Sequence, residues 1–317
     1  MKRMIQSLRR ILGMAFLLYV LIFANYLLHM SGVLNVGINP SSNTHLRERI
    51  GQVATTNLTD MESAEYDGSV VDQVDESAYA DSQTRFDDTI QHNGIGFIGM
   101  PSVDIYLPVL AGMSHDNLLT GVGTYRPDRE LGVDNYVVLS HSLVENTSNR
   151  LLNHLNQVEV GDVMYVTDYE NVYTFEVRDN HSIHETETQY IANTYDNPML
   201  TVFRCHGTYG TDYRQLVQAE LVEQRTIDDT DEEIRVMLGL GSWVDEPNMD
   251  HEPTDSDEQT IDVVEQNKDL TDIALDEMNA FERLSYQAYV LVAANYSLFI
   301  IVALSIMALY IAIVLIF

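Results

Sequence analysis

The chain has 317 residues, a single cysteine and a formal net charge of −31 at pH 7, from 48 acidic and 17 basic side chains. This acidity argues against a partner with a phosphate backbone, so we predict no nucleic-acid binding. One cysteine cannot form an internal disulfide, which makes Cys205 either a buried bystander or a reactive thiol.

The N-terminal segment has the pattern of a membrane anchor. Residues 1–10 carry four basic and no acidic side chains, and residues 11–30 are almost wholly apolar. About twenty apolar residues are the length that a transmembrane helix needs, and the basic residues ahead of it place the N-terminus in the cytoplasm. A cleaved signal peptide is the alternative. We favour the anchor because the apolar run is long and no small-residue cleavage site directly follows it.

The next segment, residues 31–91, is polar and contains few large apolar side chains. Such a composition offers little surface for a core, so we expect a polar linker with marginal helix. The composition changes over residues 92–226, where short apolar runs recur at roughly ten-residue spacing with turn-forming residues between them. This pattern predicts an all-β barrel or sandwich large enough to bury its own core.

The C-terminal third repeats the arrangement of a polar spacer followed by an apolar span. Residues 227–286 are strongly acidic, which predicts a self-repelling and flexible linker. Residues 287–317 form the second candidate transmembrane helix, and residues 298–317 contain no charge. Two spans would hold the β domain outside the cell membrane, with both termini in the cytoplasm.

Three side chains stand where apolar strands begin or end. His141 follows an apolar strand, Cys205 ends a second strand, and Arg214 starts a third. They could meet at one rim of a barrel. There the cations would favour the thiolate, the imidazole could protonate a leaving amine, and the guanidinium could stabilise an oxyanion.

Each of these residues taken alone is more often structural. A lone cysteine is commonly a buried apolar group, a histidine near a strand end commonly caps it, and an arginine is commonly a surface charge. His181, His184 and Glu185 superficially resemble metal ligands, but no matching set completes them. We therefore predict no metal and no cofactor.

Residues 94–221 resemble the sortases, cysteine transpeptidases on the surface of Gram-positive bacteria. Four stretches carry the resemblance: residues 95–109, 117–124, 134–141 and 160–177. The order and separation of His141, Cys205 and Arg214 fit the family as well. The resemblance implies a closed sortase-like β-barrel with short helices, flanked here by the two transmembrane helices.

The resemblance also implies residue roles. Cys205 would be the nucleophile, His141 the general acid and base, and Arg214 the group that holds the substrate carbonyl or oxyanion. We expect Thr201, Arg204 and Ser140 to contribute to substrate binding. The family signature before the cysteine is Thr-Leu-x-Thr-Cys, and Arg204 replaces the threonine beside the nucleophile. We hypothesise that this cation lowers the thiol pKa.

The implied function is a membrane-anchored transpeptidase. It would cleave a C-terminal Leu-Pro-x-Thr-Gly-like signal between Thr and Gly, and pass the acyl group to an amine of a cell-wall precursor. Class A members, the housekeeping anchors, look most similar, whereas a C-terminal membrane helix is typical of class C pilin polymerases. Class C members usually carry an inhibitory lid with an Asp-Pro-aromatic motif, and residues 39–93 lack that motif. A catalytically weak scaffold is a further alternative.

Overall fold

Eight strands close into a barrel in the order β10-β8-β7-β2-β3-β4-β5-β9. The computed structural model describes residues 2–31, 33–34, 37–55, 64–66, 73–74, 76–143, 150–194, 197–205, 211–241 and 269–316. The strands of the barrel are β2 (Gly94–Met100), β3 (Ile105–Leu110), β4 (Val122–Thr124), β5 (Asn135–Ser140), β7 (Val163–Thr167), β8 (Asn171–His184), β9 (Met199–Cys205) and β10 (Tyr213–Thr226). The predicted closed barrel is confirmed.

Alternation along the strands gives the barrel two apolar surfaces. Val138 and Val202 point into the barrel and join its main core. Leu139 and Phe203, the next residue of each strand, belong to a separate apolar cluster. Successive side chains of a strand face opposite sides, so the second cluster lies on the outer face of the sheet. Because both faces of these strands are buried, their sequences are continuous apolar runs and do not alternate between apolar and polar residues.

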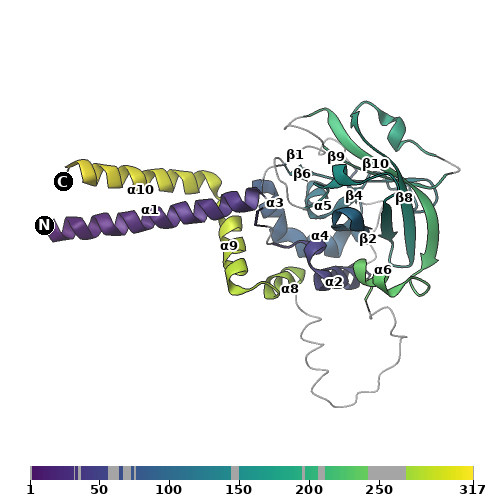
Figure 1. Cartoon of the computed structure of the whole chain (residues 1–317), viewed down its shortest axis with the longest axis horizontal. Helices are drawn as coiled ribbons and strands as arrows, with labels where there is room; N and C mark the ends of the chain where they lie inside the picture. Colours follow the sequence, from purple (N-terminus) through teal and green to yellow (C-terminus); the bar gives the residue numbers. More distant parts are fainter. Residues whose placement is uncertain are drawn as a thin grey trace, which may run out of the picture.

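A layer of helices covers one side of the barrel, below and to the left of it in Figure 1. The helices and turns outside the terminal rod are η1 (Pro40–Ser42), α2 (Thr44–Thr55), α3 (Glu76–Ser82), η4 (Gln83–Arg85), α4 (Phe86–Asn93), η5 (Pro101–Val103), α5 (His115–Thr120), η6 (Leu155–Gln157), η7 (Thr188–Ile191), α6 (Glu232–Met237), α8 (Leu270–Asp276) and α9 (Ala280–Ala294). Two short strands, β1 (Gln73–Val74) and β6 (Ser142–Leu143), pair in parallel beside the barrel.

The structure differs from the predicted polar linker over residues 31–91. Leu46 and Ile50 of α2 and Phe86 and Ile90 of α4 are buried in one cluster with Phe97 of the barrel. Each pair is spaced four residues apart, which places both members on one helix face. Few apolar residues therefore suffice for packing, and the linker prediction is wrong where these helices form.

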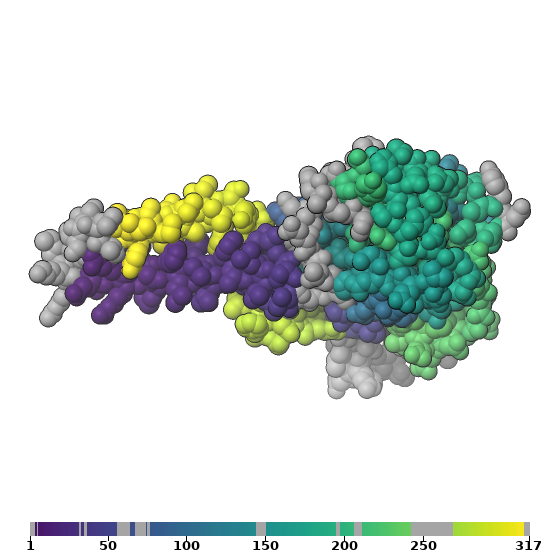
Figure 2. Space-filling view, turned by 45° about the horizontal axis from the view of Figure 1, so that its top comes forward, coloured from purple at the N-terminus to yellow at the C-terminus, as the bar shows by residue number. Residues whose placement is uncertain are grey.

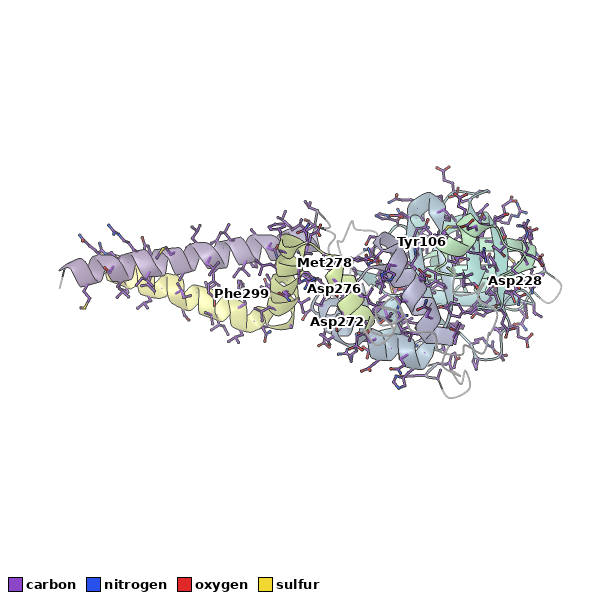
Figure 3. The ribbon with its side chains drawn as sticks, turned by 90° about the horizontal axis from the view of Figure 1, so that it is seen from below. Tyr106, Asp228, Asp272, Asp276, Met278 and Phe299 are labelled. Carbon is purple, nitrogen blue, oxygen red and sulfur yellow. The ribbon has the colours of Figure 1, made fainter. Side chains whose placement is uncertain are left out.

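The predicted acidic linker over residues 227–286 is likewise wrong in the part that the structure describes. Leu238 and Leu240 follow α6 and are buried, as are Leu270 and Ala274 of α8. The acidic side chains of α8, such as Asp272 and Asp276 in Figure 3, lie on the polar side of these short helices. Residues 242–268 of the predicted linker lie outside the described residues.

A rod of two helices projects from the helical side of the barrel, with both chain ends at its far tip (Figures 1 and 2). It consists of α1 (Lys2–Met30) and α10 (Tyr296–Ile316). Phe299 of α10 packs on Tyr19 of α1 with ring centroids 4.8 Å apart (Figure 3), and Arg9 donates to the Ile313 carbonyl at 3.1 Å. Within these helices, Gln6–Met30 and Tyr296–Ile313 are long and apolar enough to cross a membrane. The predicted second span over residues 287–317 is in fact divided between α9 and α10.

Candidate active site

The barrel places the three residues of the predicted catalytic set at one edge. Cys205 is the last residue of β9 and stands opposite Arg214 of β10 in the antiparallel register. β5 runs parallel to β9 with Ser140 opposite Arg204, so His141 follows β5 at the level of Cys205. Register partners share a face of a sheet, and residues two apart on a strand do too. The thiol and the guanidinium therefore lie on the outer apolar face, and His141 adjoins them.

Arg214 is anchored by several partners. Its Nη1 donates to the carbonyls of Thr211 at 2.8 Å and Tyr213 at 3.0 Å, and its Nη2 donates to Glu185 at 2.8 Å. The side chain is mostly buried. Among the described residues, no hydrogen bond uses its Nε. The guanidinium is thus oriented beside Cys205 with a donor left for another oxygen, while Glu185 offsets part of its charge.

His141 is buried and pairs with a second histidine that the sequence analysis did not identify. Its Nε2 lies 3.1 Å from Nδ1 of His115, and the two rings meet edge to face with centroids 4.9 Å apart. The backbone N–H of His141 donates to the Leu118 carbonyl at 3.1 Å. His115 is the first residue of α5, whose N-cap is Ser114. The contact between the two ring nitrogens can hold the ring of His141 in one orientation, with the tautomers deciding which nitrogen donates.

Arg204 lies on the opposite side of β9 from the Cys205 thiol. Alternation turns its side chain away from the face of Cys205. There its Nη1 donates to Ser142 Oγ at 3.1 Å and to the Cys205 carbonyl at 2.7 Å, and its Nη2 donates to the Asn153 carbonyl at 3.0 Å. Burial lowers the pKa of Arg204 from its ordinary value, and Cys205 acts in the opposite direction. This arginine ties β9 to the segment after β6.

The other two residues expected to bind substrate are also buried. Ser140 donates to the Leu118 carbonyl at 2.9 Å. Thr201 lies on the outer face, but its hydroxyl donates to Asn135 Oδ1 at 2.7 Å and accepts from Gln218 Nε2 at 3.1 Å. Neither Thr201 nor Ser140 has exposed surface. Arg204 is 8% exposed, and Cys205 and His141 are as buried as Thr201 and Ser140. In this structure Thr201, Ser140 and Arg204 stabilise the scaffold of the site, and their role in substrate binding stays a prediction.

An apolar surface adjoins the catalytic edge, and we call it the apolar face. Its buried members are Met113, Leu118, Val137, Leu139, Ile183, Phe203 and Leu216, with Tyr66, Tyr125, Tyr190 and Ile191 packed against them. Four of the buried members lie on β5, β9 and β10, the strands that carry the catalytic set. These members are buried beneath the residues packed on them, so the face is a small second core on the outer side of the sheet.

A short segment of the N-terminal region already lies on the apolar face. Tyr66 packs against its cluster, and the Glu65 carbonyl accepts from the Met113 N–H at 2.8 Å. Gly112 has φ +78°, and a Cβ there would come within 2.5 Å of the Glu65 carbonyl. The sequence showed no lid motif in this region, so no covering segment was expected. The contact depends on one tyrosine and on backbone bonds, which no side-chain motif reveals.

The predicted absence of a metal was based on the incomplete set around His181 and Glu185. In the structure His181 lies 3.1 Å from Asp179, and His184 Nδ1 lies 2.8 Å from Thr186 Oγ1. Across the part of the chain that the structure describes, no group of three or more His, Cys, Asp or Glu side chains could hold a metal ion.

Comparison with known proteins agrees with this geometry. The family model described as the sortase domain matches residues 98–222, which hold His141, Cys205 and Arg214. The chain belongs to the sortase family. It is 35% identical to Sortase A of Listeria monocytogenes over 127 residues, or 40% of this chain, and 29% identical to Sortase A of Streptococcus agalactiae over 174 residues.

The similarity covers about half of the chain or less in each of these comparisons. The alignment with the Listeria protein spans 56% of that protein. The alignment with the streptococcal protein spans 68% of that protein and 53% of this chain. Among solved structures, Listeria monocytogenes sortase A is 31% identical, with 94% of its chain and 45% of this chain covered at a TM-score of 0.42. The terminal rod lies outside the matched sortase domain.

Proposed function

We propose that the chain is a membrane-anchored cysteine transpeptidase. It recognises a C-terminal Leu-Pro-x-Thr-Gly-like signal, cleaves it after the threonine and joins the new carboxyl end to an amine of a cell-wall precursor. The observation that carries this proposal is the register of β5, β9 and β10. Cys205 is the register partner of Arg214, and it lies beside the end of β5, which His141 follows directly. Family membership supports the same chemistry.

In the proposed reaction the Cys205 thiolate attacks the threonine carbonyl carbon, and the carbonyl electron pair moves to oxygen. The Nε–H of Arg214, which has no hydrogen-bond partner among the described residues, stabilises that oxyanion. Collapse breaks the carbon–nitrogen bond, and His141 gives its proton to the departing glycine amine. A thioester then links the threonine to Cys205. The incoming amine loses a proton to His141 as it attacks, and the thiolate leaves.

The proposed location is the cell membrane, with the barrel outside and both termini in the cytoplasm. The two apolar helices support anchoring, because each is long enough to cross a bilayer. Their ends lie together at the tip of the rod, so both chain ends would reach the same side (Figure 1). Arg9 and Arg10 lie near that tip, and basic residues favour the cytoplasmic side.

The test is a fluorogenic sorting peptide incubated with the full chain and a cell-wall amine mimic. We expect a transpeptidation product from the wild type and none from Cys205→Ala, with the acyl-enzyme visible by mass as a peptide adduct on Cys205. Equal turnover by Cys205→Ala would refute the assignment. If the wild type binds the peptide but shows no more turnover than Cys205→Ala, the chain is a scaffold.

A class C-like pilin polymerase is the second candidate. The C-terminal apolar helix α10 and the segment around Tyr66 on the apolar face both favour it. The two candidates differ in the amine that they accept. A polymerase would use a lysine side chain of a protein subunit, so competition between a lysine peptide and the cell-wall amine mimic separates them.

A further inference from the structure

We propose that α9 lies flat on the outer surface of the membrane and buries one apolar face in it, which fixes the tilt of the barrel over the bilayer. The inference rests on the proposed membrane anchoring and adds a second contact with lipid, apart from the two spans. The occupant of this face is the bilayer that α1 and α10 cross.

α9 ends at the depth where the membrane surface would lie. The span Tyr296–Ile313 has 18 residues, and at 1.5 Å per residue it covers about 27 Å, close to the thickness of the hydrocarbon core. The membrane surface must therefore coincide with the start of α10. Tyr296 stands there beside Tyr26 of α1, with ring centroids 5.7 Å apart. Tyrosines are enriched at this depth. α9 ends at Ala294, two residues earlier.

α9 also runs in the direction expected of a helix that lies on the membrane surface. Its axis runs across the axes of α1 and α10 both in Figure 1 and in the view from below in Figure 3. If the rod crosses the bilayer, α9 lies along its surface. The angle is held by contacts with α1: the Ser285 carbonyl accepts from Asn25 at 2.9 Å, and Ser285 Oγ lies 3.1 Å from His29 Nε2. The ring of Tyr289 also stacks on His29 at 4.6 Å.

α9 exposes large apolar side chains on the side that faces away from the protein. One side of the helix packs on α1 and α3 and buries Tyr286, Tyr289 and Val292. The other side exposes Leu284 by 66% and Leu291 by 63%, and Phe281 at the first turn by 70%. Leu284 and Leu291 are seven residues apart and share one helix face, which also carries the exposed Gln287 between them. Figure 2 shows this helix, in yellow-green, uncovered beside the root of the rod.

Together these observations favour lipid over another occupant. Large apolar side chains on a helix that lies at the depth of the membrane surface are the mark of an interfacial helix. α9 follows α8, which packs on the barrel side, and leads directly into α10. Three fixed attachments, α1, α9 and α10, would hold the barrel at one orientation, where the spans alone would leave it free to lean.

The test places a single tryptophan at chosen depths. The only native tryptophan, Trp243, is replaced by phenylalanine. The full chain is then reconstituted in phosphatidylcholine vesicles with or without lipid brominated near the top of the acyl chains. An interfacial helix lies about 5–10 Å into this region, so Leu284→Trp emission should fall at least about twofold in brominated vesicles. Val160→Trp is the matched control, because Val160 is 68% exposed on the barrel and should not be quenched.

A third variant, Leu17→Trp, reports on the first span, where Leu17 is 58% exposed. Quenching of Leu17→Trp without quenching of Leu284→Trp overturns the role of α9 and leaves the membrane anchor intact. Absence of quenching in both overturns the anchor together with the inference. Blue-shifted Leu284→Trp emission without bromine quenching means that protein covers this face, which also refutes the proposal.

Discussion

Arg204 provides the sharpest test of how the site is held together. Replacing it with threonine, the residue of the family signature, removes four hydrogen bonds, to Ser142, Asn156 and the carbonyls of Asn153 and Cys205. Bonds to a charged group contribute about 1.5–3 kcal/mol each, whereas burying a guanidinium costs several kcal/mol that threonine avoids. The net loss of stability should be about 2–4 kcal/mol, because the carbonyls lose their donor.

That loss corresponds to a fall in Tm of roughly 5–15 °C for a protein of this size. The assay is thermal unfolding of the full chain in detergent, with Arg178→Thr as the matched control. Arg178 is an exposed β8 arginine that pairs with Glu220 at 2.8 Å, and its removal should leave the melting temperature almost unchanged, because an exposed ion pair is screened by water and salt. If Arg204→Thr melts at the wild-type temperature, the bonds behind Cys205 do not stabilise the site.

The same variant tests the electrostatic hypothesis. A buried cation close to Cys205 favours the thiolate, so Arg204→Thr should raise the pKa of the thiol. The measurement is the rate of Cys205 alkylation by iodoacetamide as a function of pH. An alkylation profile that does not move in the variant excludes the coupling, whatever happens to the melting temperature.

Three further predictions concern the surroundings of the catalytic set. His115→Ala should reduce kcat/KM about threefold to tenfold through the loss of one hydrogen bond to His141, and an unchanged kcat/KM contradicts a role for this contact. Tyr66→Ala should speed Cys205 alkylation if its segment shields the apolar face, and an unchanged rate contradicts that. Hydrogen bonds from Arg85 lower the pKa of Asp116, so their stabilisation is present above the ordinary carboxyl pKa and is lost as the pH falls through the folded value. Asp116→Asn should therefore melt below the wild type at pH 7, with the difference vanishing in acid; a gap that persists in acid contradicts the pairing.

Much of the barrel was predictable because strands leave a local pattern. The runs that became β5, β9 and β10 are apolar and bounded by turn residues, and these boundaries also marked His141, Cys205 and Arg214 as strand-end groups. The two membrane candidates were equally visible, because length and lack of charge are properties of a single segment.

The tertiary structure alone decided what depends on contacts between distant segments. The helices of the supposed linkers bury a few apolar residues against the barrel, and sparse apolar positions look like disorder until their partners are known. The same holds for His115 against His141, for Tyr66 on the apolar face, and for Arg204, which strand alternation turns to the back of the site. The sequence alone determined the strands, the candidate spans and the candidate catalytic residues at strand ends, because each depends on consecutive residues. Which side chains meet was decided by the closure of the barrel and the packing of helices around it.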